Sequence, residues 1–275
     1  MNKPAVEVSR WPVLGWLRYR SLFILLLKRE IQAEYRATFF GGLWPILTPL
    51  LNLVVYSIVF GAILSSPWPL PEGVTKAPPF SLILWVGIVP FGVLAEVFNM
   101  SPGEILRKPS YVKKIVFPLE LLPAVRVGVA WFHGGVGLLL LLVATMLGYH
   151  AVYWTWWGIL VIALPLFFTT LGIAWFFASL GVYFRDLANM TQVLAQLWFF
   201  ATPIVYPPRV LPSQFAFIER YNLLAFVVSS LRSVVLWNRF FSLKTWLVWV
   251  VVSGLFAAAA FLWFEYTKRG FADVL

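Results

Sequence analysis

The sequence predicts an all-α integral membrane protein with six transmembrane helices, an N-terminal amphipathic interface helix and a re-entrant outer hairpin between spans five and six. Of its 275 residues, 61% are apolar and 12% are charged, and the mean hydropathy is +0.85. A soluble domain carries about 25% charged residues, so this chain could not cover a soluble surface. Several uncharged stretches reach the ~20 residues that cross a bilayer. We therefore expect one transmembrane domain over residues 1–275.

The N-terminal segment 10–38 is expected to form an amphipathic helix in the cytoplasmic interface. Its apolar residues recur at helical spacing and its arginines fall on another face: Leu17, Ile24, Leu27, Ile31 and Tyr35, against Arg18, Arg29 and Arg36. This pattern is typical of helices that lie in the membrane surface. A plain juxtamembrane anchor is the alternative, because residues 22–27 are apolar all round.

Six apolar segments are predicted to span the membrane: 42–64, 80–100, 124–147, 154–184, 187–206 and 243–266. Five prolines between residues 65 and 79 exclude a lipid-exposed helix, so we expect a loop there. Residues 101–123 are polar and basic, which indicates a cytoplasmic loop. In the stretch 207–242, only the 16 residues 222–237 form an apolar run, and this run contains Arg232. That is short and costly for a span, so we expect a re-entrant hairpin.

The distribution of Lys and Arg predicts the orientation. With a cytoplasmic N-terminus, the six-span arrangement places 15 of the 21 basic residues on the cytoplasmic side. Basic residues stay on the cytoplasmic side of membrane spans, so both termini of this multi-pass protein are expected there. This topology accounts for the net charge of +10, so we expect no nucleic-acid partner.

The chain offers no catalytic or metal-binding constellation. It has no cysteine, and its two histidines, His133 and His150, are far apart with no acidic residue beside them. It also lacks the nucleotide-binding P-loop and the common protease and hydrolase motifs. Glu96 falls inside the second span, where we expect helix packing or snorkelling, and His133 is expected to be a packed polar group. We therefore expect no enzyme, no metal and no cofactor in this chain, and an energy source outside it.

Two stretches carry a family resemblance. The first contains Lys28-Arg29-Glu30, Glu34-Tyr35-Arg36 and Phe40-Gly41-Gly42-Leu43-Trp44-Pro45. The second contains Ile105-Leu106-Arg107-Lys108 and a basic segment ending in Phe117-Pro118, followed by Leu119-Glu120-Leu121-Leu122-Pro123. Together they resemble the permease subunits of ABC exporters for lipid-linked polysaccharides, which include the Wzm-type O-antigen, teichoic-acid and capsule permeases. The first motif departs at Glu34, where the family commonly has arginine.

The resemblance implies a half-transporter. Two copies would form a homodimer around the pathway, and two copies of a separate P-loop ATPase subunit would hold ATP and Mg²⁺ on the cytoplasmic side. The cargo would be a polyprenyl-pyrophosphate-linked, O-antigen-like polysaccharide, with membrane lipids around the protein. Teichoic acid, capsular polysaccharide, or a small lipid or drug are alternative cargoes. A membrane-embedded transferase and a stand-alone channel are the competing functions.

The resemblance also implies roles for residues. The segment 101–123 would dock in the ATPase through Arg107, Lys108, Tyr111, Lys113, Lys114, Phe117, Pro118, Leu119 and Glu120, with Leu121 as a further apolar contact. Arg185 and Asp186 would make a secondary cytoplasmic contact. The conduit would be lined by Tyr35, Trp44, Tyr56, Phe60, Trp198, Phe199 and Tyr206. At the outer gate, Arg209 and Arg232 would meet lipid phosphate or glycan charge, or act as interface anchors.

Overall fold

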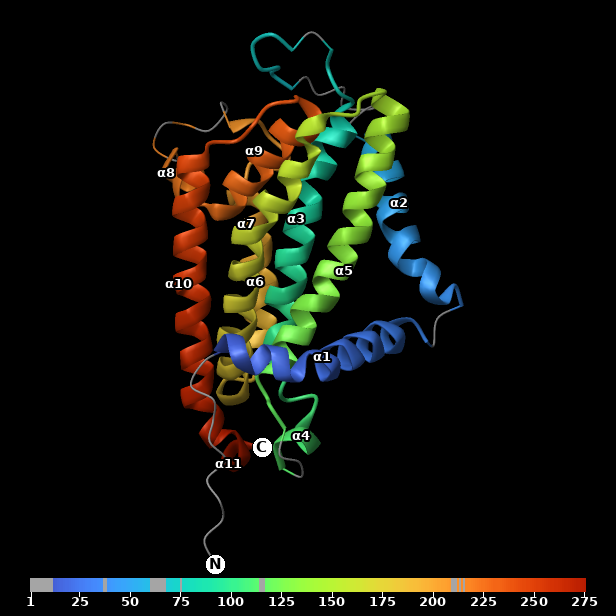
Figure 1. Cartoon of the computed structure of the whole chain (residues 1–275). Coiled ribbons are helices and arrows are strands. Elements are labelled where there is room, and N and C mark those ends of the chain that lie inside the picture. The colour runs from blue at the N-terminus through green and yellow to red at the C-terminus, as the bar shows by residue number, and fades with distance from the viewer. Residues whose placement is uncertain are drawn as a thin grey trace, which may run out of the picture.

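The computed structural model describes residues 12–36, 39–59, 68–74, 76–113, 117–208, 212, 214 and 216–275. The regular structure in these ranges is helical. Four long helices form an upright bundle: α3 (Phe80–Met100), α5 (Leu121–Ala144), α6 (Gly158–Tyr183) and α10 (Leu243–Thr267) (Figure 1). The helix α1 (Pro12–Tyr35) crosses one end of this bundle, where α4 (Pro109–Lys113) and α11 (Phe271–Val274) also lie (Figure 1). We refer to this as the α1 end.

Five helical segments are long and apolar enough to cross a membrane. They are Gly41–Val59, Phe80–Gly103, Leu121–Tyr149, Trp154–Tyr183 and Leu243–Val274. The first of them contains α2 (Trp44–Tyr56). These segments coincide with the first four predicted spans and the last one, and the chain is an all-helical membrane protein.

The predicted fifth span forms a shorter helix than expected. α7 (Leu187–Ala201) has 15 residues. Its length is about 22 Å, less than the ~30 Å hydrocarbon core of a bilayer. It ends because Pro203 follows: Thr202 is extended, with φ −104° and ψ 133°, as a residue before proline prefers. The six-span count therefore stays a prediction.

The region predicted as an outer hairpin contains α8 (Ala216–Tyr221) and α9 (Leu223–Leu236). Asn222 joins them and caps α9, because its side chain accepts a hydrogen bond from the backbone N–H of Leu224 at 3.0 Å. α9 packs against α3 and α6, in the half of the bundle away from the α1 end (Figure 1). Most of its side chains are buried. The re-entrant path of 207–242 stays a prediction.

The loop after α3 is held tightly beneath α6. A Cβ on Gly181 of α6 would lie 2.0 Å from the carbonyl oxygen of Pro102, so only glycine allows this contact. Ser101, Pro102 and Ile105 are fully or almost fully buried there. The segment 101–113 is therefore fixed at the α1 end of the bundle.

α1 packs against α5 at another glycine. A Cβ on Gly128 would lie 3.0 Å from Leu27 Cδ1 and 3.3 Å from Phe23 Cζ, and the neighbouring Leu26 is buried. Ile24 is 61% exposed, and the predicted amphipathic helix in the membrane interface stays a prediction. Because 22–27 is apolar all round, the groove at Gly128 rather than periodicity selects the packed face. The side chains of Leu17 and Arg18 lie outside the described part of the structure.

Candidate substrate pathway and coupling surface

The outward face of α10 is entirely apolar within the bundle. Its exposed side chains between residues 247 and 263 are Leu247, Val248, Val251, Val252, Leu255, Phe256, Ala258, Ala259, Leu262 and Trp263. α5 and α6 present the same kind of face through Leu139, Val143, Leu160 and Leu164. Such faces suit contact with lipid hydrocarbon, where polar side chains are costly.

α7 has a different outward face. Asn189, Gln192 and Gln196 are exposed and recur at intervals of three and four residues, so they form one row along the helix. Within the described residues these three amides have no side-chain hydrogen-bond partner in the protein. Leu197 and Phe200 are exposed beside them. An amide that faced hydrocarbon in this way would be unfavourable, so this face must meet water, cargo or another polar surface.

α2 carries a second polar stripe. Thr48 and Asn52 are exposed one turn apart, and the predicted conduit residues Trp44 and Tyr56, both partly exposed, continue the same four-residue spacing. Among α2, α3, α5, α6, α7, α9 and α10, exposed side-chain amides are confined to α2 and α7. Both helices contact α3. The amide residues were missed from the sequence, although their helical spacing was visible.

Two predicted conduit residues on α7 point into the protein. The Phe199 ring packs against Phe91 with centroids 5.0 Å apart, and the Trp198 ring packs against Phe98 at 6.0 Å. Trp198 Nε1 also donates to Asn222 Oδ1 at 3.2 Å. Tyr206 is partly exposed and donates its hydroxyl to the Phe200 carbonyl at 2.7 Å. Phe60, another predicted lining residue, lies outside the described residues.

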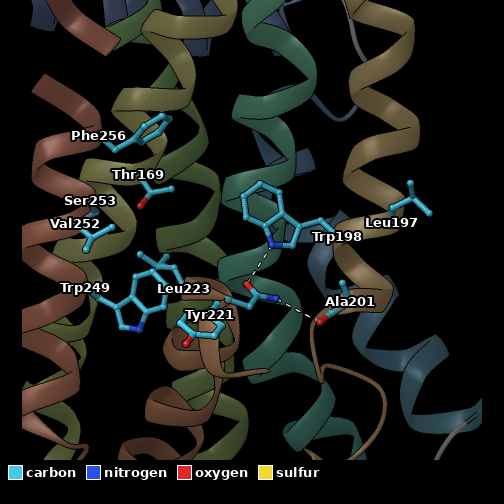
Figure 2. A pocket seen from close by; sticks show the side chains of 11 residues that line it. Thr169, Leu197, Trp198, Ala201, Tyr221, Leu223, Trp249, Val252, Ser253 and Phe256 are labelled. Atoms are coloured by element: carbon cyan, nitrogen blue, oxygen red, sulfur yellow. Dashed lines mark hydrogen bonds between the residues drawn. The ribbon is translucent and has the colours of Figure 1, made fainter. Parts of the chain in front are cut away.

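A cleft of about 510 Å³ lies between α6, α7, α9 and α10 (Figure 2). Several of its polar side chains are bonded within the protein: Thr169 donates to the Pro165 carbonyl at 2.9 Å and Ser253 to the Val250 carbonyl at 3.2 Å. Asn222 bonds to Trp198 and to the Ala201 carbonyl, as the dashed lines in Figure 2 show. The cleft is therefore mainly apolar, with the rings of Tyr221 and Trp249 in its wall.

Arg232 lies inside the protein rather than at its surface. It is 2% exposed, and its guanidinium donates to the carbonyls of Ile83 at 3.2 Å, Pro203 at 2.8 Å and Ile204 at 2.7 Å. The Trp68 ring covers its Cζ at 4.5 Å. Its predicted contact with lipid phosphate, glycan charge or the membrane interface is therefore wrong. The sequence analysis placed this arginine at the outer surface. In the structure its hydrogen bonds join α9 to α3 and to the turn after α7. Arg209 lies outside the described residues.

The start of the predicted coupling segment is tied to α1. Glu104 is buried, and its carboxylate accepts from Lys108 Nζ at 2.6 Å and from Arg107 Nη2 at 3.1 Å. Lys108 also donates to Glu30 of α1. Burial opposes the charge of Lys108, but the carboxylates of Glu104 and Glu30 prevail and raise its pKa above the ordinary lysine value. Lys108 is therefore used inside the chain, while Arg107 keeps an exposed side chain.

The remainder of the segment forms a small surface at the α1 end. Pro109, Ser110 and Lys113 are exposed, and the Tyr111 and Phe117 rings, both partly exposed, meet edge-on with centroids 4.7 Å apart. Pro118 and Leu119 are also partly exposed. Lys114 lies outside the described residues.

The end of the segment is built into the protein. Leu121 is 2% exposed, so its predicted role as an apolar contact for a partner is wrong: it opens α5 and belongs to the core. Glu120 accepts from Lys268 at 3.2 Å, which links the segment to the C-terminal end of α10. Arg185 and Asp186 form an exposed turn between α6 and α7, beside the same loop. The described residues contain no cluster of His, Asp and Glu that could hold a metal ion.

These features define a helical membrane protein with two polar outward stripes and an exposed loop surface at one end, the architecture of a membrane transporter subunit. Residues 21–236 match the family described as ABC-2 type transporter, and the chain belongs to that family. It is 28% identical to an O-antigen export system permease protein of Myxococcus xanthus, over 93% of this chain and 96% of the relative. A protein of the same description from Klebsiella pneumoniae is 28% identical over 80% and 82%. A polysialic acid transport protein of Escherichia coli is 24% identical over 77% and 80%.

Proposed function

We propose that this chain is the membrane-spanning permease of an ATP-driven polysaccharide exporter in a bacterial inner membrane, with both termini in the cytoplasm. It works as a homodimer with two copies of a separate P-loop ATPase, which binds ATP and Mg²⁺. Family membership supports this function, as do relatives named for O-antigen export and polysialic acid transport. The chain itself moves cargo and catalyses no reaction.

The observation that carries the proposal is that, among α2, α3, α5, α6, α7, α9 and α10, exposed side-chain amides occur on α2 and α7. An amide both donates and accepts hydrogen bonds, and a sugar hydroxyl does the same. A row of such groups offers many exchangeable contacts, so a polymer can advance without a single deep binding site. In the homodimer, the faces of α2 and α7 with Asn52, Gln192 and Gln196 line the pathway.

The cargo in this proposal is a polyprenyl-pyrophosphate-linked, O-antigen-like polysaccharide that leaves the cytoplasm. Capsular polysaccharide is the second candidate, favoured by the similarity to a polysialic acid transport protein. In either case the glycan follows the polar stripes, while hydrocarbon remains in the lipid.

The ATPase docks on the surface formed by Arg107, Tyr111, Lys113, Phe117 and Leu119, with the turn at Arg185 and Asp186 as a second contact. The exposure of the α4 region supports this part of the proposal. The bonds of Lys108 to Glu30 and Glu104 would pass a movement of the docked loop to α1. At the opposite end, the bonds of Arg232 to Pro203 and Ile204 would hold the turn after α7 in the position that closes the pathway between transport cycles.

Deletion of the gene, followed by analysis of surface glycan, tests the function. Loss of lipopolysaccharide O-antigen, with the lipid-linked glycan accumulating inside the cell, is the expected result. Restoration by a plasmid copy is the control. Intact surface glycan together with new drug sensitivity would contradict the proposal and indicate export of a small amphiphile. Purification of the tagged protein in mild detergent should also yield an ATPase in equal amount.

A further inference from the structure

A polar network joins α1 to two helices of the bundle. It consists of Glu34 and Tyr35 at the end of α1, Glu96 of α3, and Arg126 and His133 of α5. His133 lies twelve residues into α5, which corresponds to about 18 Å along the helix. Arg126, Glu96 and His133 have side chains only 11%, 20% and 21% exposed. Polar groups this deep are costly unless they are paired, and all of these side chains make at least one polar contact within the network, although the buried Nε of Arg126 has no partner among the described residues.

The hydrogen bonds at His133 select one tautomer. Its Nδ1 lies 2.9 Å from Glu96 Oε2 and its Nε2 lies 2.7 Å from the Tyr35 hydroxyl. An ionised carboxylate only accepts, so Nδ1 carries the proton and donates it to Glu96. In this tautomer Nε2 carries no proton and accepts a hydrogen bond from the Tyr35 hydroxyl. Arg126 donates to the other oxygen of Glu96, so the carboxylate is held from two sides.

Tyr35 is poised to act as this donor. Burial, with the nearby charges of Glu34 and Glu96, raises the pKa of Tyr35 to about 12, so its hydroxyl keeps the proton at any physiological pH. The Glu34 carboxylate lies 3.9 Å from His133 Nε2. The contact of α1 with α5 at Gly128 is apolar and does not fix the far end of the helix, whereas the Tyr35–His133 bond does.

The network stands where the chain turns from α1 toward α2. Tyr35 is the last residue of α1, and α2 begins at Trp44 with the polar stripe that includes Thr48 and Asn52. We propose that His133 is a positioning residue: its bonds to Tyr35 and Glu96 fix the end of α1, residues 29–36, which we call the elbow, and thereby the entrance of the pathway. This inference depends on the proposed function for its transport readout, but the position of the elbow can be measured without transport.

The test compares five variants of the full exporter in lipid nanodiscs: His133→Leu, Tyr35→Phe, the double variant that combines these two changes, His133→Gln and a control. His133→Leu removes both bonds of the ring, and Tyr35→Phe removes only one hydroxyl. Trp131→Phe is the matched control. Trp131 lies on α5, as His133 does, and the change removes the 3.0 Å hydrogen bond from Trp131 Nε1 to Thr170 Oγ1 of α6, which does not involve α1. Hydrogen–deuterium exchange of the backbone amides of residues 29–36 reports the elbow. Glycan export in cells and ATP hydrolysis by the purified complex report transport.

The expected result is a rise of about fivefold in exchange of 29–36 for Tyr35→Phe, the factor that corresponds to the loss of one ordinary hydrogen bond. Export should fall by a similar factor while basal ATP hydrolysis stays. The double variant should be no worse than His133→Leu alone, since both changes break the same contact. His133→Gln, whose amide also donates and accepts, should recover part of the loss. Trp131→Phe should change neither readout.

Unchanged exchange in Tyr35→Phe would overturn the inference, and so would raised exchange with normal export. An equal loss in Trp131→Phe would do the same, because it would reduce the effect to general destabilisation. If His133→Leu fails to fold, Tyr35→Phe still decides the matter. A deletion strain with normal surface glycan would refute the proposed function, whereas the exchange of 29–36 would still show whether His133 fixes the elbow.

Discussion

α7 and α10 are both largely apolar helices with an outward face, yet one of these faces carries exposed side-chain amides and the other does not. α10 exposes only apolar side chains between residues 247 and 263, whereas α7 interrupts its exposed apolar residues with Asn189, Gln192 and Gln196. These three amides raise the local cost of contact with hydrocarbon, since each would lose its hydrogen bonds to water. The positions of a few polar side chains therefore distinguish a face suited to lipid from the face proposed to line the pathway.

The largest expected effect is at Arg232, which holds the turn directly after the amide row of α7. Arg232→Leu leaves the carbonyls of Ile83, Pro203 and Ile204 without donors. The expected loss of stability is about 4 kcal/mol, from several buried acceptors left unpaired at once. Thermal unfolding of the purified protein in detergent measures it. Arg232→Lys, which keeps a cation but loses the fork of donors, should lose less, and an unchanged midpoint for Arg232→Leu would contradict the account.

A charge placed on each face tests the comparison itself. Val251→Arg on α10 should cost about 3 kcal/mol of membrane insertion, because the arginine would face hydrocarbon. Gln192→Arg on α7 should insert normally and alter export instead. Immunoblots of washed membranes give the abundance of each variant. Equal abundance of the two would remove the distinction between the faces.

The link between α1 and the coupling segment gives an intermediate effect. Lys108→Met leaves Glu104 buried with only Arg107 as partner, at an expected cost of about 2 kcal/mol. The raised pKa of Lys108 means that its stabilisation is complete below the ordinary lysine value and is lost as pH rises through the raised one. The difference in unfolding midpoint between wild type and variant should therefore stay constant from about pH 6 to 9. A difference that vanished within this range would show that the ion pairs do not form.

The smallest effect on folding is expected at the amides. Replacing Gln192 and Gln196 together by leucine should leave abundance and basal ATP hydrolysis unchanged, because neither amide is hydrogen-bonded to another described residue. Export should fall by about fivefold, the factor for one or two lost hydrogen bonds to cargo. Val193→Leu, on the same exposed face, is the control. Normal export in the double variant would exclude a direct role for these amides.

Much of the fold could be predicted from the sequence. The segments around α3, α5, α6 and α10 are long, apolar and contain few charges, so length and composition suffice to predict them. The basic loop 101–123 was also predicted from the sequence. The way it is anchored could not be predicted, because the contact of Gly181 with Pro102 joins two segments far apart in sequence.

The direction of side chains was beyond sequence reasoning. Trp198 and Phe199 were chosen for the conduit as aromatic residues, but a helix that is apolar all round gives no sign of which face packs inward. Arg232 was assigned to the outer gate because it lies in a short apolar run predicted as a re-entrant hairpin. Its burial could not be predicted, because its carbonyl partners lie elsewhere in the chain. The amide row on α7 could have been predicted, because its residues recur at intervals of three and four in the sequence. This row marks the face that we propose lines the pathway.

Thiol accessibility along α7 and α10 tests the central claim most directly. The chain contains no cysteine, so single cysteines at Gln192, Gln196, Val251 and Leu255 need no background removal. A charged, membrane-impermeant thiol reagent is applied to the complete exporter in lipid nanodiscs. We predict that positions 192 and 196 react at least about tenfold faster than positions 251 and 255, because hydrocarbon excludes both the reagent and the thiolate. Equal rates on the two helices would contradict the assignment of the pathway to α7.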